Sequence, residues 1–196
     1  PMVHDPPPGL GMAETVFRGG KSDYWEGGIR VAAFAWWPGM IPAGSIIGDM
    51  LHEMDLYPTF ARLAGATDRI PTDRIIDGID QTALFLKGDT NGRRDYVHIY
   101  QGPNLGATVK GNIKKHWIDP DPGAASGLSA SFFDLLSDTR EKNGMMVNTF
   151  HLNEAFVRAR ARHELWKRKY PDSPRAHGIA YAGLANARPE TKALGQ

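Results

Sequence analysis

The chain has 196 residues, of which 41% are hydrophobic and 23% charged, and its 23 lysines and arginines nearly balance 22 aspartates and glutamates. This composition excludes a collagen-like or wholly disordered chain, and a net charge of +1 argues against a protein built mainly to bind nucleic acid. The absence of cysteine excludes disulfides, thiolate metal sites and a cysteine nucleophile from these residues, and leaves open whether the compartment is bacterial cytoplasm or periplasm.

Residues 1–11, PMVHDPPPGLG, predict an extended loop on a surface or at the rim of a site, because prolines and glycines dominate them. They show neither the basic nor the apolar region of a signal peptide, and the first residue is not Met. We therefore expect the chain to begin within a longer protein. His4 in this loop is a candidate to line a binding pocket, and a mobile surface histidine is the alternative.

Residues 28–37 form the first predicted strand. They are almost continuously apolar after Arg30 and are followed by Pro38 and Gly39. Such a run is typical of a strand covered on both faces in a mainly parallel α/β sheet, although a helix of similar length is the alternative. The run is far shorter than the roughly 20 residues that a membrane helix needs, so we expect no transmembrane segment.

Residues 55–65 predict a short helix that would continue an α/β layer. Asp55 suits the N-cap, Pro58 falls in the first turn, and Gly65 suits the C-cap. The apolar residues expected on one face are Leu56, Phe60, Leu63 and Ala64.

A second layer is predicted after the turn-rich residues 66–93. Strand-like runs occupy residues 95–101, 107–110, 113–118 and 131–136, and Gly111-Asn112 is a hairpin turn between two of them. This spacing predicts a small antiparallel sheet.

The clearest predicted helix covers residues 153–170, with Asn153 as its N-cap and Pro171 beyond its end. Its apolar face suits docking on the small sheet, or contact with another copy in a homo-oligomer. The opposite face is basic, so a surface that binds nucleic acid or an anionic membrane is the alternative.

Residues 17–30, FRGGKSDYWEGGIR, carry the chemistry. Two glycine pairs flank Lys21, and glycines allow unusual turns and close approach to a ligand. A lysine held on such a loop at a sheet edge would bind an anion such as a sulfate or phosphate ester. By composition alone, a solvated lysine on a glycine-rich turn is the alternative.

This segment, followed by WWPGMIPAG at 36–44, MDLYPTFARLAG at 54–65 and DGID at 77–80, resembles the C-terminal part of type I sulfatases. These enzymes form the arylsulfatase family in the alkaline-phosphatase-like superfamily. Residues 133–143, FDLLSDTREKN, are similar to the closing strand of the family, Tyr/Phe-Asp-Leu followed by Asp-Pro-x-Glu-x-x-Asn, with Thr139 in place of the proline.

The resemblance covers the chain to about residue 147 and implies an α/β fold. Residues 1–88 would be the terminal portion of the alkaline-phosphatase-like α/β sandwich that forms the catalytic domain. Residues 89–170 would be a small C-terminal antiparallel β-sheet subdomain with a packing helix, and residues 171–196 an extended tail.

The function implied by the resemblance is hydrolysis of small-molecule sulfate esters by a formylglycine nucleophile and a divalent cation, normally calcium (Ca2+). The lysine of the family's Gly-Gly-Lys loop binds sulfate, and Lys21 occupies that position, which makes it the candidate catalytic and substrate-binding residue. Arg18 would either face the same anion or pair with a carboxylate. Asn104, Gly106 and Trp117 are candidates for the mouth of the substrate site.

The family's nucleophile motif, Cys/Ser-x-Pro-Ser-Arg, is absent from this sequence, and so are its Asp-Asp pair and its Asp-Asn-Gly triplet. We therefore expect no metal ligands in this chain, both cofactors in the N-terminal half of the same enzyme, and no activity from this chain alone. The alternatives are a phosphonate monoester hydrolase or phosphodiesterase of the same superfamily, and a non-catalytic binding module derived from a sulfatase.

Overall fold

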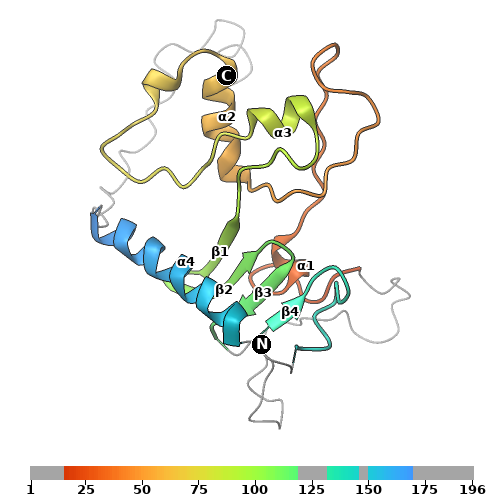
Figure 1. Cartoon of the computed structure of the whole chain (residues 1–196), viewed down its shortest axis with the longest axis vertical. Coiled ribbons are helices and arrows are strands. Elements are labelled where there is room, and N and C mark those ends of the chain that lie inside the picture. The colour runs from red at the N-terminus through yellow and green to blue at the C-terminus, as the bar shows by residue number, and fades with distance from the viewer. Residues whose placement is uncertain (1–15, 119–131, 146–149, 170–196) are drawn as a thin grey trace, which may run out of the picture.

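The computed structural model describes residues 16–118, 132–145 and 150–169. The loop that contains His4 and the tail predicted for residues 171–196 lie outside the described residues. Figure 1 shows a small sheet with a long helix along it, and two further helices above the sheet.

Four strands form one antiparallel sheet in the order β1-β2-β3-β4: β1 (Tyr96–Gln101), β2 (Asn104–Lys110), β3 (Ile113–His116) and β4 (Phe132–Asp134). The predicted small antiparallel sheet is therefore confirmed. Gly111 in the β2–β3 turn has a φ of 57°, which glycine adopts without steric penalty.

The two faces of the sheet bury different groups, because side chains alternate along each strand. One face carries the apolar core, in which Tyr24 from the beginning of the chain joins strand residues: Ile99, Ala107, Val109 and, after β4, Leu135. The other face is covered by the last helix.

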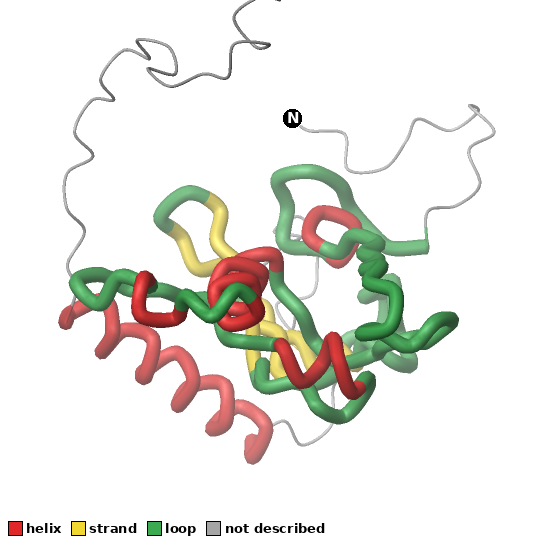
Figure 2. The backbone as a smooth tube through the Cα atoms, turned by 90° about the horizontal axis from the view of Figure 1, so that it is seen from above, coloured by secondary structure: helices red, strands yellow, loops and turns green. Residues whose placement is uncertain are grey.

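That last helix, α4 (Phe150–Lys169), begins before its predicted start. Phe156 and Ala159 are buried, and the Phe156 ring meets Phe132 edge to face at 5.5 Å, which confirms that the apolar side docks on the sheet. Both Figure 1 and Figure 2 show α4 beside the sheet. The predicted N-cap is wrong, because Asn153 lies within the helix and accepts a hydrogen bond from Lys115.

The strand predicted for residues 28–37 does not form among the described residues. The chain forms a four-residue helix, α1 (Glu26–Ile29), and residues 31–40 then run as an exposed, unpaired segment. A strand needs a neighbour to satisfy its backbone N–H and C=O groups. Among the described residues, every strand belongs to the small antiparallel sheet, and none pairs with residues 31–37.

The predicted first helix is confirmed as α2 (Leu56–Leu63), which follows a 3₁₀ turn, η1 (Glu53–Asp55). Its predicted apolar face is not the buried one: Thr59 is buried and Phe60 is 58% exposed. The buried face is set by a polar contact, because the Thr59 hydroxyl accepts a hydrogen bond of 2.9 Å from the N–H of Gln81.

Asp55 does not cap α2 as predicted. Its carboxylate is fully buried, pairs with Arg94, and accepts a hydrogen bond of 2.8 Å from the N–H of Ile79. Asp55 therefore links α2 to residues that precede β1.

The turn-rich segment contains a 3₁₀ turn, η2 (Thr67–Arg69), and a third short helix, α3 (Thr82–Lys87). Asp80 holds the beginning of α3, because its Oδ1 accepts hydrogen bonds from the N–H and the hydroxyl of Thr82, at 2.9 and 2.6 Å. None of the helices that the structure describes has both the length and the apolar character needed to cross a membrane.

Candidate anion-binding site

Lys21 lies at the tip of an exposed turn. Its neighbours Gly19 and Ser22 both have a φ of 79°, so the chain bends sharply on either side of it. Within residues 16–118, 132–145 and 150–169, no ion pair or hydrogen bond occupies its ammonium group. The structure therefore presents a cation outward from a tightly curved loop.

The loop is closed by its own hydrogen bonds. The N–H of Gly27 donates to the carbonyl of Arg18 at 2.7 Å and joins the two ends. Inside the loop, the Asp23 carboxylate accepts from the N–H groups of Gly20 and Trp25, at 2.7 and 2.9 Å. These hydrogen bonds within the loop therefore fix the shape of the turn that carries Lys21, without contacts from the rest of the protein.

The second glycine pair is required by close packing. A Cβ atom on Gly27 would lie 2.5 Å from the Arg18 carbonyl oxygen, and a Cβ on Gly28 would lie 2.5 Å from Oδ1 of Asp23. Neither position has room for a side chain. The pair therefore lets the two ends of the Lys21 loop touch, which is how these glycines shape the site.

Two buried aromatic rings attach the loop to the core face of the sheet. A Cβ on Gly106 would lie 1.9 Å from the Tyr24 ring, so that ring rests directly on the backbone of β2. The Trp25 ring lies 4.9 Å from the His116 ring and 5.9 Å from the Phe133 ring. The Lys21 loop is thereby held against β2, β3 and β4.

A cluster of buried charged groups lies beneath the loop, and we call it the buried charge cluster: Glu26, Lys114, His116 and Glu141. The Lys114 ammonium is fully buried and lies 3.1 Å from Oε1 of Glu26 and 3.0 Å from Oε1 of Glu141. Nε2 of His116 lies 2.9 Å from the same Glu141 oxygen. The other Glu141 oxygen accepts a hydrogen bond of 2.7 Å from the N–H of Glu26.

The environment of this cluster sets the charges of its members. Burial lowers the pKa of His116, although the hydrogen bond to Glu141 works against that effect. Burial alone would raise the pKa of Glu141, but the hydrogen bond from His116, the charge of Lys114 and the N–H of Glu26 together lower it. Near neutral pH the cluster therefore holds an ionised Glu141 next to a neutral imidazole.

Arg18 lies at the junction of loop and sheet. Its guanidinium group is 3.9 Å from the centre of the Trp25 ring, and its Nη1 donates a hydrogen bond of 3.2 Å to the Glu141 carbonyl. These contacts give Arg18 a structural part in the site, and its contact with an anion stays a prediction. The other candidate, His4, lies outside the described residues.

Sequence reasoning missed the cluster because nothing in the residues next to Lys114 indicates that this lysine is buried. The signal was available in the register: the Gly111-Asn112 turn pairs Val109 with Lys114, and the same register pairs Ala107 with His116. Residues opposite buried apolar residues share their face. This pairing places Lys114 and His116 on the core face.

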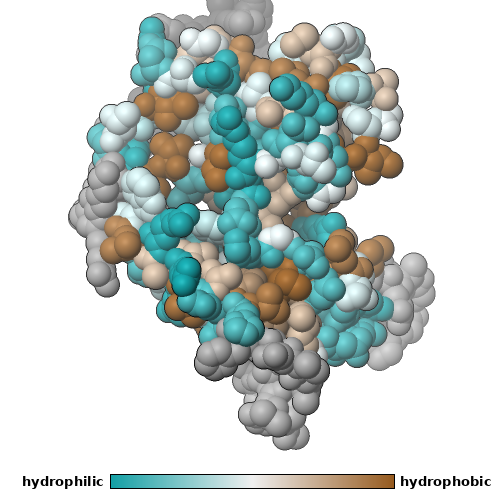
Figure 3. Space-filling view, viewed as in Figure 1, coloured by the Kyte–Doolittle hydropathy of each residue, from teal (hydrophilic) through white to brown (hydrophobic). Residues whose placement is uncertain are grey.

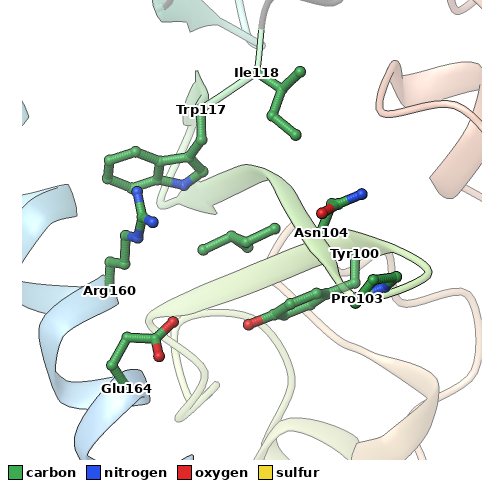
Figure 4. Close-up of a pocket in the computed structure, with 8 residues that line it drawn as sticks. Tyr100, Pro103, Asn104, Trp117, Ile118, Arg160 and Glu164 are labelled. Carbon is green, nitrogen blue, oxygen red and sulfur yellow. The ribbon is translucent and has the colours of Figure 1, made fainter.

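A separate hollow of about 300 Å³ lies on the α4 side of the sheet (Figure 4). Trp117 lines it with Arg160, whose guanidinium is 4.9 Å from the ring centre, and Glu164 points in from α4. Asn104 also lines it, whereas Gly106 contacts Tyr24 on the opposite face. The three residues proposed for one substrate mouth therefore do not line a common pocket in the described chain.

The described residues do not fit a metal site. Across the part of the chain that the structure describes, no three side chains of the metal-binding types His, Asp and Glu are arranged so that they could hold a metal ion. The sequence has no cysteine. Neither a bound cation nor a cysteine-derived nucleophile can therefore be assigned to these residues.

No protein-family model matches the chain. It is 41% identical over 99 residues to the steryl-sulfatase of Rattus norvegicus, an alignment that covers 50% of this chain and 17% of that protein. It is 39% identical over 152 residues to the N-acetylgalactosamine-6-sulfatase of Canis lupus familiaris, which covers 74% of this chain and 28% of that protein.

A solved structure is also similar. The PsFucS1 sulfatase from Pseudoalteromonas sp. superposes with a TM-score of 0.69 and 30% identity, over 81% of this chain and 34% of that one. The chain thus spans about a third or less of the length of these relatives.

Proposed function

Since this chain is a relative of the sulfatases that spans only part of their length, we propose that it is the C-terminal portion of a sulfuric ester hydrolase and supplies Lys21 to bind the sulfate group. The observation that carries this proposal is the ammonium of Lys21, which pairs with none of the described residues and lies on a loop closed by the Gly27–Arg18 hydrogen bond. Aryl sulfate esters are the substrate class that the resemblance to arylsulfatases favours.

An ammonium at this position suits the chemistry. In hydrolysis of a sulfate ester, water adds across the S–O bond, and the products are an alcohol and sulfate. Negative charge develops on the bridging oxygen as the bond breaks, and a cation held in place stabilises that charge without having to reorganise. The closed loop fixes the backbone that carries the Lys21 side chain.

Calcium and formylglycine would be provided by other parts of the enzyme. Among the described residues, no group of three His, Asp or Glu side chains could hold a metal ion, and the chain has no cysteine. Our proposal therefore assigns the nucleophile and the metal ligands to the N-terminal portion of the same protein, and we expect no turnover from this chain alone.

The exposed segment after α1 supports this division. Val31, Phe34, Trp36 and Ile46 are 84%, 98%, 83% and 92% exposed. Figure 3 shows hydrophobic side chains on the edge of the molecule where this segment runs in Figure 1. Side chains of this kind are normally buried. We infer that residues 31–37 add a strand to a sheet of the N-terminal portion, which would complete the α/β domain.

The assay that tests this function compares the complete protein on matched aryl sulfate and aryl phosphate esters. We expect faster hydrolysis of the sulfate ester. Faster hydrolysis of the phosphate or phosphonate ester would favour the related phosphonate monoester hydrolases and phosphodiesterases, because the anions share a tetrahedral geometry. Hydrolysis of neither ester would favour a non-catalytic binding module.

A further inference from the structure

The Lys21 loop depends on a residue that comes more than a hundred positions later. The hydrogen bonds within the loop fix its shape, but its placement relative to the sheet needs contacts from outside. Glu141 makes two of these contacts: its Oε2 accepts from the N–H of Glu26 at 2.7 Å, and its carbonyl accepts from Arg18 at 3.2 Å. These contacts lie at the two ends of the loop.

The backbone at Glu141 indicates that its side chain is needed there. Its φ is 51°, in the left-handed region that costs a residue other than glycine about 1 kcal/mol or more. Glycine would adopt this conformation freely. A glutamate here therefore indicates that the side chain itself has a role. The structure shows its carboxylate fully buried and hydrogen-bonded to the loop.

The buried charge cluster holds that carboxylate in one place. Lys114 lies 3.0 Å and His116 2.9 Å from its Oε1, and both residues are on the rigid strand β3. With Oε1 fixed to the sheet, Oε2 accepts from the N–H of Glu26 at the beginning of α1. Buried ionic groups often add little net stability compared with apolar residues, so stability alone does not explain this arrangement.

We propose that Glu141 is a positioning residue for Lys21: its carboxylate, held by Lys114 and His116, fixes the beginning of α1 and thereby sets where the Lys21 ammonium meets the substrate anion. This inference rests on the proposed function. In this proposal, the contact between residues 25–28 and the segment after β4 aligns the sulfate-binding cation.

A double-mutant cycle on the complete protein tests this proposal. Glu141→Gln keeps the shape of the side chain but removes its charge, and we expect kcat/KM for an aryl sulfate ester to fall about 10- to 100-fold, the range for misplacement of a catalytic group. If Glu141 acts through Lys21, the same change made in Lys21→Ala has almost no further effect. Glu154→Gln, on the exposed side of α4, is the matched control and should leave the rate unchanged.

The outcomes separate the two hypotheses. Equal losses from Glu141→Gln in both backgrounds, or no loss in the otherwise unchanged protein, would overturn the positioning role while leaving the proposed function intact. Activity that survives Lys21→Ala would overturn both. Thermal melting checks that each variant folds. If Glu141→Gln does not fold, His116→Leu enters the same cycle, because it removes one of the two groups that hold Oε1 of Glu141 and keeps the Lys114 pairs, and the same non-additivity with Lys21→Ala is expected.

Discussion

The side-chain carboxylate of Glu141 accepts a hydrogen bond of 2.7 Å from the backbone N–H of Glu26, across a separation of 115 residues. This bond joins the glycine-rich loop near the beginning of the chain to the segment that follows the last strand. It lies in a buried site and is surrounded by charged groups. Several properties of the protein should depend on how those groups are paired.

The first prediction concerns Lys114. Lys114→Met leaves the carboxylates of Glu26 and Glu141 buried next to each other without their shared cation. Breaking such a pair costs about 3–5 kcal/mol, so we expect the free energy of unfolding, measured with urea, to fall by about that amount. Lys110→Met removes an exposed pair and should cost less than about 1 kcal/mol. Equal losses would contradict the account of the cluster.

The second prediction concerns pH. Burial, followed by the charge of His163, lowers the pKa of His98 to about 4. In the unfolded chain the pKa of His98 is near 6.5, so His98 binds a proton at a higher pH there than in the folded protein. The free energy of unfolding therefore falls as the pH falls from about 6.5 to about 4. We expect this histidine to account for about 1–3 kcal/mol of that loss, because it is only partly buried. Melting temperatures measured across this pH range should fall less in His98→Gln, and an unchanged pH dependence would refute the assignment.

The third prediction concerns Gly106. Its Cα faces the Tyr24 ring so closely that an added Cβ would lie 1.9 Å from a ring atom. Gly106→Ala must therefore push the ring or the strand away, and we expect a loss of about 1–3 kcal/mol in unfolding free energy. Gly48→Ala is the matched control, because its Cβ would meet its nearest neighbour at 3.7 Å. A tolerated Gly106→Ala would show that Tyr24 does not rest on β2.

The fourth prediction concerns the exposed apolar segment. If residues 31–37 add a strand to a sheet in the complete protein, their amide hydrogens should exchange slowly with solvent there, because each second N–H is then hydrogen-bonded. Hydrogen exchange followed by mass spectrometry measures this directly. Residues 72–77, in the turn-rich part after η2, serve as the fast-exchanging reference. Exchange at 31–37 as fast as in that reference would contradict the proposed division of the fold.

The elements that the sequence predicted well are those with local or near-neighbour determinants. The antiparallel strands follow from alternation and the Gly111-Asn112 turn, and α2 and α4 follow from helical periodicity. The strand at 28–37 was wrong for the described chain, because its apolar pattern presupposes a sheet that the described residues do not contain.

The site divides in the same way. Lys21 was singled out by the resemblance to the sulfatases, since its glycine-rich surroundings alone left a solvated lysine as the alternative, and the structure places it on an exposed turn. The contacts of Glu141 with Glu26 and Lys114 join residues far apart in the sequence, so no local sequence pattern predicts them. Only the strand register, combined with the fold around α1, brings these charges together.

The most direct test of the central claim is the effect of Lys21→Ala on kcat/KM for an aryl sulfate ester, measured in the complete protein. Loss of a fixed charge-stabilising group should lower this value by about 100-fold or more without changing the melting temperature. Lys87→Ala, at another exposed lysine, should leave it unchanged. If Lys21→Ala retains activity within a few-fold of the unaltered protein, Lys21 does not bind the sulfate group and the proposed site is wrong.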